Sequence, residues 1–313
     1  MRRGILKDSK PGLQIFFVLL TVLASWVIFQ LLSMLSAMLF YDLTLVDISS
    51  AMSNLEDPVI IGFLKYVQAI TSIGMFIVAS LIISWFISEH PMRFLELDRH
   101  KGIAITLLVI LLMIFSLPMN NFLTYLNQSL KLPEGLSWLQ EYFIEQETSM
   151  EKVMERFLRP ENSLSLFVNL FVIAIIPAIG EEMLFRGIIQ KIFIRWFGNI
   201  HTGILVTALL FGVLHFQFLS LLPRFVLGII IGYLFVWTRT LWMPILAHFI
   251  VNATAVVFYH FHYSDLIGLE METVGTPESH LSYAFLSLTF VVITLFVIRR
   301  VMKEKNKDVR PSI

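Results

Sequence analysis

The chain has 313 residues, of which 57% are hydrophobic and only 15% are charged, and its mean hydropathy is +0.79. Soluble domains carry about a quarter charged residues, so this composition excludes an ordinary water-soluble protein and predicts an all-α polytopic membrane protein. The 23 basic and 23 acidic residues balance, which argues against nucleic acid as a partner, and the absence of cysteine excludes disulfides, thiolate zinc sites and cysteine nucleophiles.

Apolar runs long enough to cross a bilayer predict about eight transmembrane helices. In chain order they are Leu13–Tyr41, Val59–Ile87, Ile103–Leu126, Leu164–Ile194, Gly203–Leu222, Phe225–Thr238, Leu241–Phe258 and Leu281–Ile298. The first run is too long for the hydrophobic region of a signal peptide, so we expect it to be a span. Pro118 is expected to end or kink the third.

Between the third and fourth spans, the segment "LSWLQEYFIEQETSMEKVMERFL" has apolar residues at helical spacing. This pattern is typical of a helix that lies along the membrane interface, and it also fits a plain loop helix. We divide the chain into three spans with this loop (1–160), a core of spans (161–260), and a last span with a basic tail (261–313).

Lysine and arginine alternate between the loops. They occur in the N-terminus, in the loop after the second span, near Lys191 and Arg195, and in the tail, whereas "YDLTLVDISSAMSNLEDP" and "HFHYSDLIGLEMETVGTPESH" contain none. Cytoplasmic loops are enriched in these residues. The pattern therefore predicts an even number of spans with both termini in the cytoplasm.

Apart from Lys65, Gln68 and Asn169, which we assign to snorkelling or to contacts between helices, a main cluster of six ionisable or amide residues lies inside the predicted spans, where such groups cost free energy and mark functional sites. They are Glu181, Glu182, Arg186, His215, His248 and Asn252. Counted along the predicted helices, they fall roughly 10 to 20 Å from the cytoplasmic helix ends, in one slab of the membrane.

The spacing of these residues along the helices predicts different roles for them. Glu182 and Arg186 are four residues apart and are expected to pair, whereas Glu181 points about 100° away on the helix. His248 and Asn252 also share a helix face. Pro177 and Gly180 are expected to loosen the helix just before the glutamates.

A carboxylate, two imidazoles and an amide in an apolar site suit the attack of water on a peptide bond. The same inventory would suit a structural ion-pair cluster. There is no G-x-S-x-G elbow, H-E-x-x-H motif or Walker loop in the sequence.

Three short motifs resemble those of the CPBP family of intramembrane proteases, also called Abi or CAAX-protease-like. "EEMLFRG" resembles the family's EExxxR motif, "FGVLH" its FxxxH motif and "HFIVN" its HxxxN motif, in the family order. The resemblance covers about Asn162 to Val257. It implies cleavage of a membrane-associated or lipid-modified peptide in the bilayer, as in the trimming of prenylated proteins, or a role in bacteriocin maturation or immunity, in the inner or plasma membrane of a bacterium.

Carried onto this sequence, the resemblance implies that Glu181 and His215 activate water and that His248 and Asn252 hold the oxyanion. Glu182 and Arg186 would brace the site, and their pairing argues for Glu181 as the base. Zinc on Glu181, His215 and His248 is an alternative, but we favour a mechanism without a cofactor.

Two other functions fit part of the pattern. A proton-coupled transporter also keeps charges at mid-membrane, although it would usually show two related halves. A family member that binds a peptide or an immunity partner without cleaving it would keep the same motifs. The substrate and the oligomeric state are not readable from the sequence.

Overall fold

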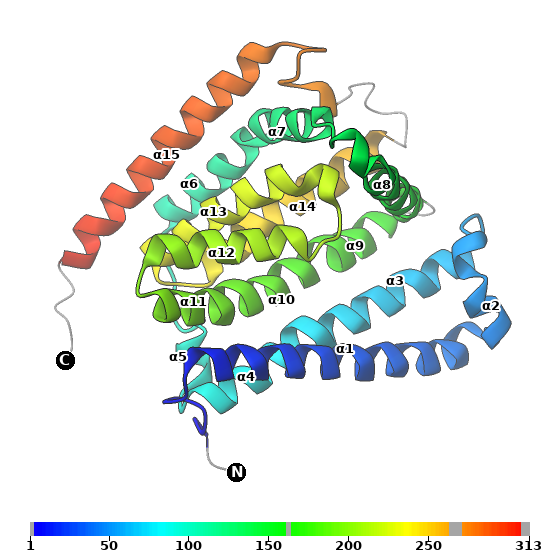
Figure 1. The fold of residues 1–313 in the computed structure, drawn as a ribbon, viewed down its shortest axis with the longest axis horizontal. Coiled ribbons are helices and arrows are strands. Elements are labelled where there is room, and N and C mark those ends of the chain that lie inside the picture. The colour runs from blue at the N-terminus through cyan, green and yellow to red at the C-terminus, as the bar shows by residue number, and fades with distance from the viewer. Residues whose placement is uncertain (1–2, 161–163, 263–270, 308–313) are drawn as a thin grey trace.

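In the computed structural model, which describes residues 3–160, 164–262 and 271–307, every regular element is a helix (Figure 1). Six segments are long and apolar enough to cross a membrane, and one bent pair of helices makes a seventh. The prediction of an all-α polytopic membrane protein is confirmed.

The helices follow one another with short connections. The α-helices are α1 (Pro11–Tyr41), α2 (Leu45–Ser49), α3 (Pro58–Ser72), α4 (Ala79–Ile87), α5 (Pro91–Phe94), α6 (Ile103–Phe115), α7 (Leu117–Ser129), α8 (Ser137–Leu158), α9 (Ser165–Asn169), α10 (Ile176–Leu184), α11 (Gln190–Phe197), α12 (Ile200–Val213), α13 (Leu221–Thr238), α14 (Trp242–His262) and α15 (Leu281–Lys307). The π-helical turns are η2 (Ile73–Val78), η4 (Leu170–Ile175) and η5 (Phe185–Ile189), and the 3₁₀ turns are η1 (Ala51–Ser53), η3 (Glu134–Leu136), η6 (Phe218–Ser220) and η7 (Met271–Thr273).

The predicted fifth span, Gly203–Leu222, is wrong at its C-terminal end. The helix there, α12, ends at Val213 after 14 residues and is shorter than the other spanning segments. Phe216 has a left-handed backbone with φ 53°, which a helix cannot continue through, and α13 begins at Leu221. His215 therefore follows a helix and does not lie within one.

Two other local predictions are confirmed. The third span is broken into α6 and α7, which are bent by 40° at the Ser116–Pro118 step. The segment between the third and fourth spans forms the 22-residue helix α8, and it buries Glu147, Phe157 and Leu158 against the rest of the protein.

Some predictions concern residues that the structure does not describe. Residues 161–163, at the first predicted domain boundary, lie outside the described residues, as do 263–270 in the loop after α14. Arg2 and Arg310, which contribute to the predicted orientation, also lie outside them. The three-part division of the chain stays a prediction.

The segment Ser165–Phe197 runs through the centre of the molecule (Figure 1). In its most apolar window 44% of the residues are buried, compared with 11% for α1. On one side it packs against α1 and the α3–η2–α4 helix, and on the other against α12 and α14. Because neighbours surround this segment, its polar side chains face protein and not lipid.

Gly180 makes the close approach of α10 to η2 possible. A Cβ atom at this position would lie 2.6 Å from the Phe76 Cβ and 3.2 Å from Ile77. These atoms belong to packed helices and cannot easily move aside.

We expect Gly180→Ala to destabilise the protein by about 1–3 kcal/mol through overpacking. Thermal unfolding of the full-length protein in detergent measures this. Gly135→Ala is the matched control, because nothing lies within 4 Å of a Cβ at Gly135. Equal melting temperatures for the two variants would contradict the packing argument.

Candidate active site

The central segment carries the two glutamates on a short α-helix between two π-helical turns. The helix α10 begins with Pro177 in its first turn, directly after η4, and η5 follows it with Arg186. Proline has no N–H and clashes with the preceding turn, so a wider turn before it relieves the helix. The predicted loosening at Pro177 is confirmed, and the helix runs wider on both sides of Glu181 and Glu182.

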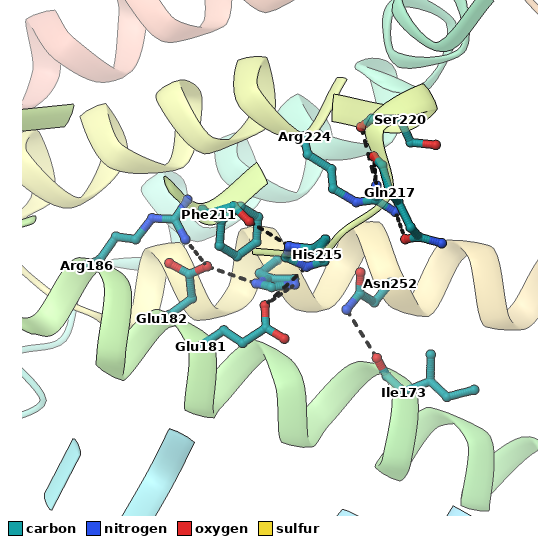
Figure 2. Close-up of polar contacts among 11 residues, drawn as sticks. Ile173, Glu181, Glu182, Arg186, Phe211, His215, Gln217, Ser220, Arg224 and Asn252 are labelled. Atoms are coloured by element: carbon teal, nitrogen blue, oxygen red, sulfur yellow. Dashed lines mark hydrogen bonds and ion pairs between the residues drawn. The ribbon is translucent and has the colours of Figure 1, made fainter. Parts of the chain in front are cut away.

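Glu182 is fully buried and has two partners on different helices. Its Oε1 accepts a hydrogen bond of 2.8 Å from Arg186 Nη1 and lies 2.9 Å from His248 Nδ1 on α14. The Arg186 guanidinium also donates to the Gly228 carbonyl of α13 at 3.3 Å. The predicted Glu182–Arg186 pair is confirmed (Figure 2). With His248 and the Gly228 carbonyl, it joins three spanning segments.

Glu181 faces the two imidazole rings. Its Oε2 lies 3.9 Å from His215 Nε2 and 4.0 Å from His248 Nε2, and this buried oxygen has no hydrogen-bond partner. These separations are too long for direct hydrogen bonds and have the length that one bridging water molecule spans. The divergence of the adjacent glutamates therefore gives them different surroundings, as the helix geometry predicts.

The turn after α12 holds His215. Its Nδ1 lies 2.6 Å from the Phe211 carbonyl oxygen. Because a carbonyl only accepts, Nδ1 carries the proton, and the Nε2 of a neutral ring, which faces Glu181, can accept a hydrogen bond. The Phe211 ring lies 4.8 Å from the Arg186 guanidinium and packs edge-on to both imidazoles. The phenylalanine of the FxxxH pattern thus has a structural role that sequence reasoning did not assign.

Asn252 joins the site from the next turn of α14, but its amide has another partner. Its Nδ2 donates to the Ile173 carbonyl in η4 at 3.1 Å. In a π-helical turn the hydrogen-bond register shifts, and such turns leave a backbone group to be satisfied by a side chain. One of the two amide hydrogens of Asn252 is thereby used, and the second is left to donate elsewhere.

A cavity of about 430 Å³ opens beside these groups. His215, His248 and Asn252 line it together with Asn120 of α7 and Arg224 of α13. Glu181 is not among its lining residues, so a molecule in the cavity meets the imidazoles first. The structure brings the six predicted residues into one cluster, of which His215, His248 and Asn252 line the cavity.

Arg224 and Glu147 are two site residues that the sequence analysis missed. Arg224 donates to the Gln217 carbonyl at 3.3 Å, to the Ser220 carbonyl at 3.4 Å and to the Gln217 side chain (Figure 2). Glu147 of α8 accepts from the Leu219 backbone at 3.0 Å and from the Ser220 hydroxyl. Together they fix the turn that carries His215. In the sequence, Glu147 cannot be distinguished from the other acidic residues of this amphipathic helix. Only its burial in the structure identifies it as part of the site.

The side chains do not fit a zinc ion. Ligand atoms around tetrahedral zinc lie roughly 3.3–3.5 Å apart for bonds of about 2.0–2.1 Å. The Glu181 oxygen is 3.9 and 4.0 Å from the two imidazole nitrogens. Within the described residues, no group of three histidine, aspartate or glutamate side chains is arranged to hold a metal ion.

Fold and site together define a class: an integral membrane protein with a carboxylate and two imidazoles clustered beside a cavity between its helices. Residues 163–254 match the family model described as type II CAAX prenyl endopeptidase Rce1-like. This part of the chain is therefore similar to the CPBP family, a family of intramembrane CAAX-type proteases.

One curated relative extends the comparison. The uncharacterized protein YpbD of Bacillus subtilis (strain 168) is 33% identical over 89 residues, which are 27% of this chain and 42% of the relative. The matched part thus spans less than half the length of that relative. No solved structure matches the chain.

Removal of Glu182 should destabilise the fold far more than removal of Glu181. Glu182→Ala leaves the buried Arg186 charge without its partner, for which we expect a loss of about 3–5 kcal/mol. Glu181→Ala removes a carboxylate whose buried oxygen has no hydrogen-bond partner, for which we expect less than about 1 kcal/mol.

Thermal unfolding in detergent distinguishes the two variants. Exchange of both Glu182 and Arg186 for methionine should restore much of the lost stability, because a buried pair can be replaced by apolar side chains at little cost. If Glu181→Ala melts at or below Glu182→Ala, the division between a bracing and an unpaired glutamate is wrong.

Proposed function

We propose that the protein is an intramembrane endopeptidase that hydrolyses a peptide bond with water activated by Glu181 and His215. The observation that carries this proposal is the buried Glu181 oxygen without a hydrogen-bond partner, about 4 Å from two imidazoles beside a cavity. A water molecule at that position would contact the carboxylate and the His215 Nε2, whose Nδ1–H is held by the Phe211 carbonyl.

The proposed reaction uses only a water molecule, the peptide and these side chains. Glu181 and His215 accept a proton from the water as its oxygen attacks the peptide carbonyl, and the same groups return a proton to the leaving amine. Negative charge develops on the carbonyl oxygen. We propose that His248 in its imidazolium form, which the Glu182 carboxylate 2.9 Å from Nδ1 favours, donates from Nε2 to this oxygen, and that the second amide hydrogen of Asn252 also stabilises it.

Glu182 and Arg186 are positioning residues in this scheme. Their ion pair is fully buried and keeps the Nδ1 side of the His248 ring occupied, which leaves Nε2 to face the site. Metal-bound water is not used, because the three side chains do not fit a zinc ion.

The substrate is proposed to be a membrane-associated or lipid-modified peptide. The family description names a prenyl endopeptidase, and the cavity opens between apolar helices, so a peptide held at the membrane by a lipid chain suits the site. We also propose that both termini face the cytoplasm of a bacterium, which the distribution of lysine and arginine supports.

Loss of the base tests the proposal. Glu181→Gln should lower cleavage by at least 10²-fold while the melting temperature stays near that of the wild type. A fluorescence-quenched peptide with an S-farnesyl cysteine is one probe. Comparison of the peptides that accumulate in cells with either protein tests other substrates.

Glu145→Gln is the matched control, since Glu145 is an exposed glutamate on α8. If both variants and the wild type leave the same peptides, the chain is not a peptidase. Peptide binding by the wild type without any cleavage would instead support the alternative of a binding or immunity protein.

Metal removal gives a second test. Incubation with 1,10-phenanthroline should leave the wild-type cleavage rate within about twofold, because a carboxylate and an imidazole can activate water without a metal ion. Loss of cleavage that returns only on addition of Zn²⁺ would contradict this mechanism and favour the zinc alternative.

A further inference from the structure

A second cavity, of about 450 Å³, lies between the start of α12, the end of α13 and the C-terminal half of α15. Its polar lining residues are His201, Tyr233, Arg239, Arg299 and Lys303, and Trp237 forms part of its wall. None of these residues lines the cavity of the candidate active site. The end of α15 and the start of α12 lie on the same side of the bundle (Figure 1).

The rim of this cavity holds three cations and no acid. Within the part of the chain that the structure describes, Arg239, Arg299 and Lys303 form no ion pair within 4.0 Å, and no aspartate or glutamate lines the cavity. The neighbouring Arg300 behaves differently, because its Nε lies 3.4 Å from Glu304. Three unneutralised charges around one hollow favour an anionic ligand.

Aromatic and apolar groups form the rest of the wall. Tyr233 and Trp237 stack with ring centroids 5.2 Å apart, and the Arg299 guanidinium lies 6.0 Å from the Trp237 ring. The remaining lining residues, Ile200, Val236 and Met302, are apolar. A ligand here would therefore meet both cations and hydrocarbon.

The cavity also lies at the ends of apolar helices. The spanning helix α13 ends at Thr238 and α12 begins at Ile200, so the cavity lies at the helix ends, where lipid phosphates are found. Tyrosine and tryptophan are enriched at this level, and basic pockets between spanning helices bind anionic headgroups.

We propose that this cavity binds the phosphodiester headgroup of an anionic phospholipid. The cations of Arg239, Arg299 and Lys303 contact the phosphate, and one acyl chain lies along Val236 and Met302. The site is separate from the candidate active site and does not depend on hydrolysis.

Native mass spectrometry of the full-length protein in mixed micelles tests the assignment. Dioleoylphosphatidylglycerol should bind with higher affinity than dioleoylphosphatidylcholine. The double variant Arg239→Gln/Arg299→Gln should bind the anionic lipid on the order of 30-fold more weakly, at about 1 kcal/mol for each charge near the surface. Arg239→Lys/Arg299→Lys keeps the charges and should stay within a few-fold of the wild type.

Arg300→Gln is the matched control, because Arg300 adjoins Arg299 but does not line the cavity, and it should bind as the wild type does. Inorganic phosphate at the concentration of the lipid should not displace the bound phosphatidylglycerol from the wild type, since phosphate lacks the acyl chain. Equal affinity for the two lipids, unchanged binding by the glutamine variant, or full displacement by phosphate would each overturn the proposal. If the glutamine variant does not fold, the comparison of the two lipids on the wild type and on Arg299→Gln decides it.

Discussion

The buried carboxylate of Glu182 is the interaction on which the site depends. A charge without water around it must be paired, and Glu182 is paired twice, with Arg186 on its own helix and with His248 on α14. Arg186 in turn reaches the Gly228 carbonyl on α13. This one group fixes the orientation of the helices that it joins, the orientation of the His248 ring and the position of the neighbouring Glu181. A shift of any of these would leave a charge or a polar group without a partner.

Adjacent glutamates with opposite surroundings are the chemical consequence. Consecutive residues on a helix point about 100° apart, so the burial of one beside a cation directs the other elsewhere. Glu181 meets two imidazole nitrogens at about 4 Å and a cavity beyond them. A paired carboxylate is suited to bracing, whereas an unpaired carboxylate beside imidazoles is suited to accepting a proton. This contrast supports the proposed division of roles within the EExxxR pattern.

Irregular backbone supplies the rest of the geometry. The π-helical turn η4 places the Ile173 carbonyl where Asn252 can donate to it, and the turn after α12 lets His215 donate to the Phe211 carbonyl. Contacts from distant segments hold that turn, with Arg224 on one side and Glu147 of α8 on the other. The part of the chain outside the matched region 163–254 therefore contributes to the site, since α8 precedes that region.

Hydropathy and short-range spacing by themselves determined the membrane class, most of the spans, the break at Pro118 and the choice of the six candidate site residues. These depend on transfer energies and on the helical period, which are local properties. Tertiary structure alone decided where α12 ends, that His248 hydrogen-bonds to Glu182 and that Asn252 donates to a backbone carbonyl. It also decided that Glu147 and Arg224 secure the His215 turn. These contacts join residues between 4 and 79 positions apart, and a pairing between helices is set by packing, on which one-dimensional periodicity carries no information.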